Sequence, residues 1–298
     1  MKDRILMPCI PLRGLSIFPR TILHFDIGRE KSIKALESAM NGDKLLFVAS
    51  QKDENILIPT PDDYYQVGTV VKVKQMLKIQ GDAVRVLVDG QYRATLEEIV
   101  TEEPFIQAAV EEAEIIPADN TELEVQAMMR SVLCAFDEYI ELNPAVKEEV
   151  YDLINSIEEP DIFADTIAMQ MDIKISAKQE ILEAFDVKER LEILNRIILE
   201  ENQILRLEKD ISEKVQESVK QNQKEYILRE QMKAIQDELG YGEEAAGEAA
   251  RWTEELEKLE LDEKITEKVK REINKFTKMA PNSADAAVIR NYVETVIG

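Results

Sequence analysis

The sequence predicts an α+β chain of several domains: a β-rich, small, barrel-like N-terminal domain, followed by a helical bundle and one very long α-helix. Three observations lead to this prediction. Residues 1–117 contain runs in which every second residue is apolar, bounded by turn residues, which is typical of strands. From residue 121, apolar residues recur at the 3- or 4-residue spacing of helices. Residues 161–239 contain neither proline nor glycine, so one helix can run without interruption.

The N-terminal domain is expected to contain short strands and a single helix. The helix is predicted over residues 29–41, because Ile33, Leu36 and Met40 share one face and Asn41–Gly42 can end it. Many short strands with one helix indicate a small, partly closed barrel. The early strands are predicted near residues 4–11, 23–28 and 44–50.

A longer strand is predicted over residues 67–79, VGTVVKVKQMLKI. Most of its apolar residues share the parity that should face the interior, and its lysines share the other parity. Met76 lies on the lysine parity and is therefore expected at the surface. The pairs Gly81–Asp82 and Asp89–Gly90 stand between alternating runs, so they predict the turns of a meander of hairpins.

Residues 118–185 are predicted to form a compact bundle of short helices. Each helix start has a local signal, either a capping residue followed by an acidic or amide residue, or a proline at the first helical position. The predicted starts are Thr121, Asn143–Pro144, Pro160 and Ser176.

Residues 186–239 are predicted to form the very long helix. Asp186 with Glu189 provides the start, and Gly240 is the expected stop. At 1.5 Å per residue such a helix would be roughly 80 Å long, too long to be covered by a bundle of short helices. Its apolar residues therefore need a partner outside their own domain.

Near its end, in YILREQMKAIQDELG, this helix places Tyr226, Met232 and Ile235 on one face. These residues are candidate contacts to neighbouring subunits or to exposed apolar segments of an unfolded client protein. A flexible thioether such as that of Met232 suits varied partners. The alternative is that the face packs against a fold-back from residues 252–279.

The segment GYGEEAAGEAA (240–250) is small, acidic and glycine-bearing, and we interpret it as a hinge. Residues 251–298 are predicted to be helical, with Ser283 as the cap of the last helix. The final residues are apolar, which we interpret as truncation within a longer protein.

Composition argues against several classes of function. The net charge of −23 and the isoelectric point of about 4.6 disfavour binding to nucleic acids or to anionic membranes. No apolar run approaches the roughly 20 residues of a membrane helix. Cys9 and Cys134 are expected to be buried thiols in a reducing compartment, so a soluble, cytoplasmic protein is predicted. Residues 94–129 are rich in acidic side chains. This segment is either a docking surface for a partner or, as we favour, a solvent-exposed strand and loop.

Motifs of catalysis are missing from the sequence. His24 is the single histidine, and no cysteine or second histidine stands near it to complete a metal site. Neither the phosphate-binding pattern G-x-x-x-x-G-K-[ST] nor the nucleophile pattern G-x-S-x-G occurs. We therefore predict no catalytic, cofactor-binding or metal-binding residue in this chain.

Five segments in order resemble the Lon proteases. PLRGLSIFP (11–19) resembles their opening motif, and GTVVKVKQMLKIQGDAVRVLVDGQYRATL (68–96) resembles their hairpin region. ADTIAMQMDIKISAKQEILEAFDVKERLEIL (164–194) resembles their helical bundle. QKEYILREQMKAIQDELG (223–240) is similar to their long helix, and MAPNSADAAVIRNYVETV (279–296) to the lead-in to their ATPase module.

The resemblance implies a homohexameric, ATP-dependent serine endopeptidase with a Ser–Lys dyad behind an AAA+ ring. Such an enzyme needs ATP and Mg and degrades misfolded and regulatory proteins in the cytoplasm. The N-terminal region of the family is implicated in substrate selection and in gathering subunits. Because no Walker A loop is present, we expect neither ATPase nor protease activity in this fragment and no cofactor bound to it.

In the β-rich domain the candidate client contacts are Phe18 and Pro19, after the opening motif, and Met76. For Met76 the alternative is a scattered surface residue without function. A competing hypothesis makes the chain a coiled-coil scaffold that only dimerises. Glu201 and Glu208 interrupt the apolar seam of the long helix and count against that hypothesis.

Overall fold

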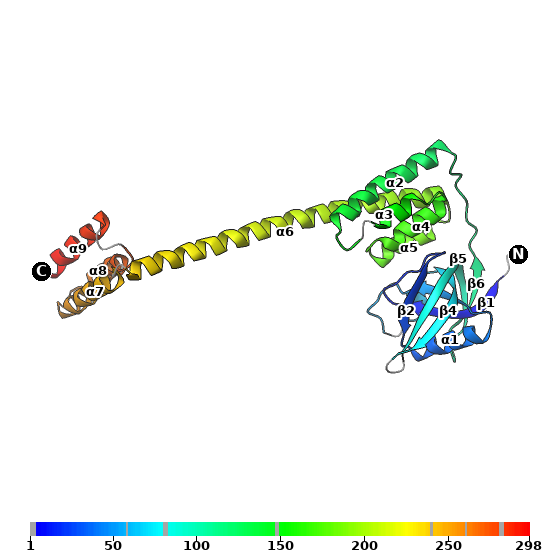
Figure 1. Cartoon of the computed structure of the whole chain (residues 1–298). Coiled ribbons are helices and arrows are strands. Elements are labelled where there is room, and N and C mark those ends of the chain that lie inside the picture. The colour runs from blue at the N-terminus through cyan, green and yellow to red at the C-terminus, as the bar shows by residue number, and fades with distance from the viewer. Residues whose placement is uncertain are drawn as a thin grey trace. The chain divides into compact units, whose positions relative to one another are not determined.

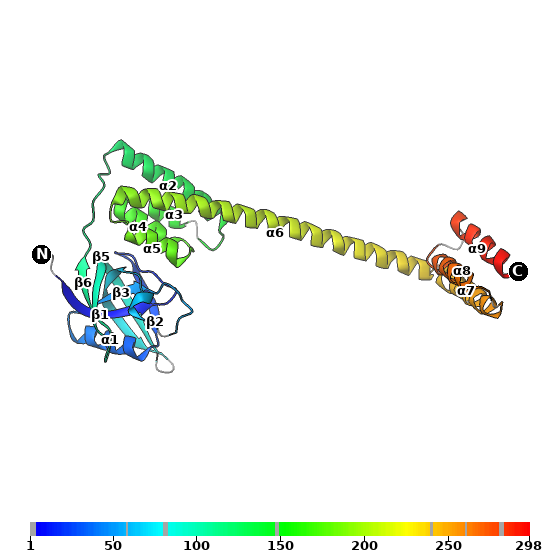
Figure 2. The ribbon, with the colours of Figure 1, turned by 180° about the vertical axis from the view of Figure 1, so that it is seen from behind.

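The fold is taken from a computed structural model of the chain. The structure describes residues 4–57, 59–79, 83–146, 149–238, 241–259, 261–279 and 283–298. The chain forms two compact units, Met1–Asp210 and Ile211–Gly298, and each is described by itself. Figures 1 and 2 show the elements of both units from opposite sides.

The first unit begins with a six-stranded sheet in the order β2-β5-β4-β3-β1-β6. Strands β5 and β6 also pair with each other, so the strands β5, β4, β3, β1 and β6 form a closed sheet. Strand β2 pairs with β5 and lies outside this closed part. The predicted strands and the helix are thus present, and α1 packs against β1 and β3 (Figure 1). The elements are β1 (Ile5–Leu12), β2 (Ile22–Ile27), α1 (Glu30–Asn41), β3 (Leu45–Ser50), the short 3-10 turn Pro61–Asp63, β4 (Val67–Lys78), β5 (Val84–Thr101) and β6 (Gln107–Glu112).

The strand β5 corrects one predicted turn. Asp89–Gly90 was expected to end a strand, but β5 continues through both residues. Gly90 serves a different purpose, because a Cβ atom at this position would lie 2.3 Å from the carbonyl oxygen of Phe18. Glycine allows this close backbone approach within a strand. The other expected turn, Gly81–Asp82, lies outside the described residues.

The pairing of β4 with β5 also corrects the predicted position of Met76. The register shifts between Val73 and Gln75, as at a β-bulge, and such an irregularity exchanges the two faces of a strand. Beyond the shift Met76 is half-buried and packs against the sheet interior, whereas Leu77 is 52% exposed. The parity expected to face the interior is buried from Val67 to Val73, but Gly68 and Val70 on the other parity are buried as well, so the strict alternation expected over residues 67–79 is wrong.

The short helices pack around the first part of α6, and their apolar faces form one hydrophobic core (Figure 1). Three predicted starts are wrong. Asn143–Pro144 begins a turn, and the next helix starts at Glu149. Thr121 does not cap the helix Leu123–Leu142, whose N-cap is Glu122, and Ser176 lies inside the helix Ile175–Glu183, whose N-cap is Lys174. The start predicted at Asp186 is confirmed, since its carboxylate accepts a hydrogen bond of 2.8 Å from the backbone N–H of Lys188. The helices are α2 (Leu123–Leu142), α3 (Glu149–Asn155), α4 (Pro160–Gln170), α5 (Ile175–Glu183) and α6 (Val187–Glu238).

Helix α6 confirms the very long helix that the sequence predicts. The expected stop, Gly240, lies outside the described residues. The expected hinge at residues 240–250 is helical from Tyr241 onward, because α7 begins there. Buried Ala245 and Ala249 contribute to an apolar core, which explains why this alanine-rich segment is helical.

The second unit contains α7 (Tyr241–Lys258), α8 (Glu263–Phe276) and α9 (Ala284–Ile297), which share an apolar core. Its centre is Trp252, whose ring lies 4.9 Å from that of Phe276 between centroids. Ser283 caps α9 as predicted, since its hydroxyl accepts a hydrogen bond from the N–H of Ala286.

The two thiols differ in environment, which corrects another prediction. Cys9 is buried in β1, but Cys134 on α2 is exposed. In the part of the chain that the structure describes, no group of histidine, cysteine and carboxylate side chains is arranged to hold a metal ion. Within the same residues no helix combines the length and the apolar character that crossing a membrane would require.

Candidate functional site

The helical bundle is attached to the sheet by a buried cluster of charged side chains. Arg93 on β5 donates two hydrogen bonds to the carboxylate of Asp165 on α4, at 2.8 and 2.5 Å. Arg190 on α6 donates a third, at 3.3 Å, to the same carboxylate. The three side chains are 2%, 5% and 0% exposed, respectively. One carboxylate thus holds two guanidinium groups from different parts of the fold.

Two backbone carbonyl groups add to this cluster, whereas Nη2 of Arg190 is buried and has no partner among the described residues. The Nε atoms of Arg93 and Arg190 donate to the carbonyl oxygens of Leu182 and Ala184, each at 3.0 Å. Burial lowers the pKa of Arg190 to about 10, while the charge of Asp165 opposes that shift, so its guanidinium stays protonated at neutral pH. The cluster fixes how the bundle sits on the sheet within the first unit.

The structure corrects the expected exposure of two candidate contacts. Phe18 is 0% exposed, and Pro19 is also buried. Phe18 belongs to the core of the helical bundle, and the guanidinium of Arg93 lies 5.9 Å from the centre of its ring. Phe18 therefore joins the sheet to the bundle, and neither buried residue offers an apolar surface to a client. The sequence placed these two residues in a loop, where side chains are usually exposed. Sequence spacing does not show that a distant helical bundle covers this loop.

The three candidates on α6 are exposed side chains. Tyr226, Met232 and Ile235 are 65%, 60% and 56% exposed. A group of exposed, large apolar side chains marks a contact surface for another molecule more often than a single exposed apolar side chain does. Further exposed apolar side chains lie on the same helix. We define the α6 apolar surface as these three together with Ile211, Val215, Val219, Ile227 and Leu228.

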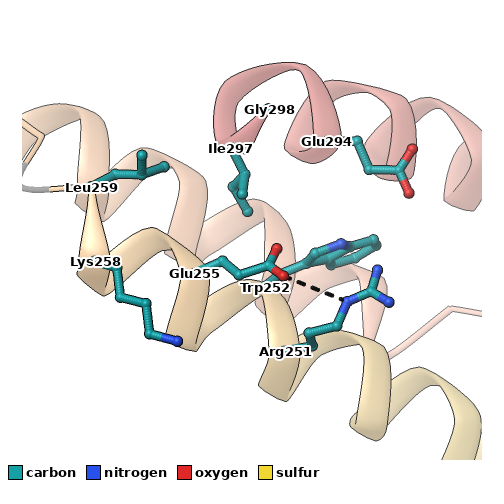
Figure 3. A pocket seen from close by; sticks show the side chains of 8 residues that line it. All are labelled: Arg251, Trp252, Glu255, Lys258, Leu259, Glu294, Ile297 and Gly298. Carbon is teal, nitrogen blue, oxygen red and sulfur yellow. Dashed lines mark ion pairs between the residues drawn. The ribbon is translucent and has the colours of Figure 1, made fainter.

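A cavity of about 390 Å³ lies in the second unit between α7 and α9. Figure 3 shows Trp252 in its middle, Ile297 reaching in from α9, and the ion pair between Arg251 and Glu255 at its edge. Trp252 is 1% exposed, and its indole N–H has no hydrogen-bond acceptor among the described residues. No serine, cysteine or histidine is among the described residues that line the cavity.

Comparison with known proteins decides the family. The family model of the ATP-dependent protease La (LON) substrate-binding domain matches residues 7–200. The chain belongs to the LON substrate-binding domain family.

Relatives of similar sequence extend the match beyond residue 200. The Lon protease of Clostridioides difficile is 46% identical over 97% of the chain, and that of Bacillus thuringiensis is 43% identical over 98%. The chain spans only 37% and 36% of these two relatives. Among solved structures, the N-terminal domain of Mycobacterium avium complex Lon protease covers 65% of the chain with a TM-score of 0.53 at 20% identity, which supports the fold.

The family match includes the buried cluster that sequence reasoning missed. Residues 7–200 contain Arg93, Asp165 and Arg190. One signal was available, because Asp165 interrupts an apolar helix face formed by Phe163, Ala164, Ile167 and Ala168. A carboxylate on such a face is almost never buried without a charged partner. The identity of that partner, on a strand 72 residues away, could not be read from spacing.

Proposed function

We propose that this LON substrate-binding domain captures unfolded or damaged protein clients for an ATP-dependent serine protease and helps to gather its subunits. The observation that carries the proposal is the α6 apolar surface in a chain of this family. An unfolded client exposes apolar side chains that a folded protein covers, so such a surface gains more by binding the unfolded form. Recognition here requires no chemistry.

The parent enzyme in this proposal is a cytoplasmic AAA+ homohexamer that uses ATP, Mg and a Ser–Lys dyad. Each single contact of a client with one α6 apolar surface is weak. Several copies on one ring raise the effective concentration, so avidity supplies the affinity. The net charge of −23 disfavours acidic clients, and added salt should relieve this repulsion. Membranes and nucleic acids are not partners in this proposal.

The experiment is a binding titration by fluorescence anisotropy with one labelled protein in two forms, native and permanently unfolded. We expect binding to the unfolded form alone, and weaker binding after Met232→Asp or Tyr226→Asp. Gln223→Asp is the matched control, because it adds the same charge at an exposed position of α6 without removing an apolar side chain. Equal binding of both protein forms would contradict client selection.

Met76→Asp is not a clean test of client binding. The side chain of Met76 packs against the sheet interior, so a charge there would disturb folding. Leu77→Asp replaces it, because Leu77 is the exposed neighbour. A loss of client binding with Leu77→Asp would extend the contact surface to the β domain.

The second candidate function is a scaffold that only dimerises through α6. The observation in its favour is the four-residue spacing of exposed Ile211, Val215 and Val219 on one helix. It predicts a stable dimer that Ile211→Asp would dissociate, measured by light scattering over a dilution series. A monomer at all concentrations would rule out the scaffold and leave client capture.

A further inference from the structure

A second cavity of about 390 Å³ lies in the sheet domain, away from α6. It is bounded by the end of β1, by β2 and by the beginning of α1. Most of its wall is apolar, with Leu12, Leu15, Phe25 and Leu57 among the lining side chains. A cavity of this size and character suits a small apolar group.

The lining of this cavity includes hydrogen-bond donors, among them the hydroxyl group of Ser32. Ser32 is 5% exposed, and its hydroxyl makes no hydrogen bond in the described part of the chain. A ligand in the cavity that accepts a hydrogen bond would give this hydroxyl a partner. Such a donor distinguishes this cavity from an ordinary packing defect.

Two guanidinium groups add positive charge. Arg29 donates through Nη2 to Gln51 at 3.1 Å, and Gln51 is held in turn by the carbonyl groups of Asp53 and Ile56. The second nitrogen, Nη1, is buried and has no partner among the described residues. Arg13 is exposed at the same cavity and has no ion pair within the described ranges.

The first turn of α1 lies in this wall as well. Gly28, Arg29 and Ser32 line the cavity, and no side chain caps the N-terminus of this 12-residue helix. Free N–H groups at a helix start favour a negative charge. The one acidic side chain in the lining, Asp26, is already bound by both Nε and Nη2 of Arg85, at 2.7 and 2.8 Å. Its charge is therefore largely compensated.

We propose that this cavity binds the free C-terminal carboxylate of a polypeptide whose last residue is apolar. The carboxylate accepts hydrogen bonds from Arg13, Arg29 and Ser32, and the apolar side chain enters the wall formed by Leu12, Phe25 and their neighbours. Guanidinium groups bind carboxylates with charge-assisted, directional hydrogen bonds. The inference rests on the proposed function, because it specifies which part of a client this domain holds.

The test compares two short labelled peptides ending in leucine, one with a free carboxylate and one with a C-terminal amide. We expect the amide to bind the 298-residue chain about tenfold more weakly, or worse, because it loses the charge. Ser32→Ala and Arg13→Gln should each lower the affinity for the free-carboxylate peptide by a factor of about three to ten. Neither variant should change the affinity for the amide peptide. Lys72→Gln is the control, since this exposed cation does not line the cavity.

Further measurements separate a carboxylate site from unfolding of the variants and from general anion binding. Thermal unfolding of the variants checks the fold, and Ser32→Ala removes a hydroxyl that has no partner to lose. N-acetylleucine should displace the acid peptide, whereas equal displacement by inorganic phosphate would reduce the cavity to a general anion site and overturn the proposal. Equal affinity of acid and amide peptides would also overturn it. If the unfolded client still binds in that case, client capture stands and only the C-terminal site fails.

Discussion

The guanidinium of Arg93 on β5 and the carboxylate of Asp165 on α4 form a bidentate ion pair in which both side chains are buried. Arg190 reaches the same carboxylate from α6. A buried ion pair contributes little net stability compared with apolar packing, but removing one partner leaves a charge without compensation. The pair is therefore most informative when only one member is changed.

Asp165→Asn should destabilise the first unit strongly. The substitution leaves the charges of Arg93 and Arg190 buried without a carboxylate, and a cost of about 3 to 5 kcal/mol in the free energy of unfolding is expected. Urea denaturation followed by far-UV circular dichroism measures it. Asp26→Asn is the control, because its ion pair with Arg85 is exposed, and this variant should change the transition little. Similar transitions for both variants would contradict the role of the cluster.

Gly90→Ala should be much more harmful than Gly28→Ala. A Cβ atom at Gly90 would lie 2.3 Å from the carbonyl oxygen of Phe18, so backbone must move, whereas a Cβ atom at Gly28 meets nothing within 4 Å. Overpacking of this kind typically costs about 1 to 3 kcal/mol. Melting temperatures of the two variants give the comparison. An unchanged melting temperature for Gly90→Ala would show that β5 and Phe18 are not in close contact in solution.

The two cysteines should react at very different rates with a thiol reagent. Cys134 is exposed, while Cys9 is buried and burial raises the pKa of its thiol to about 12. Only a thiolate reacts, so one thiol should be modified in the native protein and both after denaturation. Cys134→Ser removes the native reaction and serves as the control. Rapid modification of two thiols in native protein would contradict the burial of Cys9.

The same thiol makes stability depend on pH. The pKa of Cys9 is about 12 in the folded chain against an ordinary value of 9.0, so the folded state binds more protons between these values. The contribution of Cys9 to the free energy of unfolding is therefore largest below pH 9. It decreases as the pH rises from 9 toward 12. Cys9→Ala should reduce that decline. Denaturation at several alkaline pH values compares the two proteins, and parallel curves would show that Cys9 has no part in it.

Phe276→Ala should destabilise the second unit by about 3 to 5 kcal/mol, because it removes a buried ring between Trp252 and Arg290. Trp252 is the single tryptophan of the chain, so its emission reports on this unit. The midpoint of the emission change should fall in Phe276→Ala and stay unchanged in Asp165→Asn. Equal shifts in the two variants would show that the units unfold together.

The elements that sequence patterns predicted well depend on neighbours along the chain. Asp186 starts α6 and Ser283 starts α9 through hydrogen bonds within three residues of each cap, so the pattern contains the whole interaction. The long helix followed from the absence of proline and glycine. Tyr226, Met232 and Ile235 are exposed on this helix, and their role as contacts stays a prediction.

The features that sequence patterns missed depend on contacts between distant segments. The register shift after Val73 inverts the exposure of Met76 and Leu77, and only the pairing with β5 reveals it. Phe18 is buried because a helical bundle covers it. Arg29 and Ser32 lie together at the start of α1, but Arg13 comes from a loop that meets them only in the folded domain. Sequence spacing does not bring Arg13 to this helix start.

The position of Arg93 within β5 has a mechanical consequence. Arg93 is paired with Thr69 of β4, and its carbonyl oxygen accepts a hydrogen bond from the N–H of Ala113. A force that pulls on α4 would therefore enter the sheet at the interior of its longest strand, where backbone hydrogen bonds on both sides share the load. If the force acted at the end of a strand, the backbone hydrogen bonds would break one after another. At this interior position several of them must break at the same time. The bundle and the sheet should resist traction as one body.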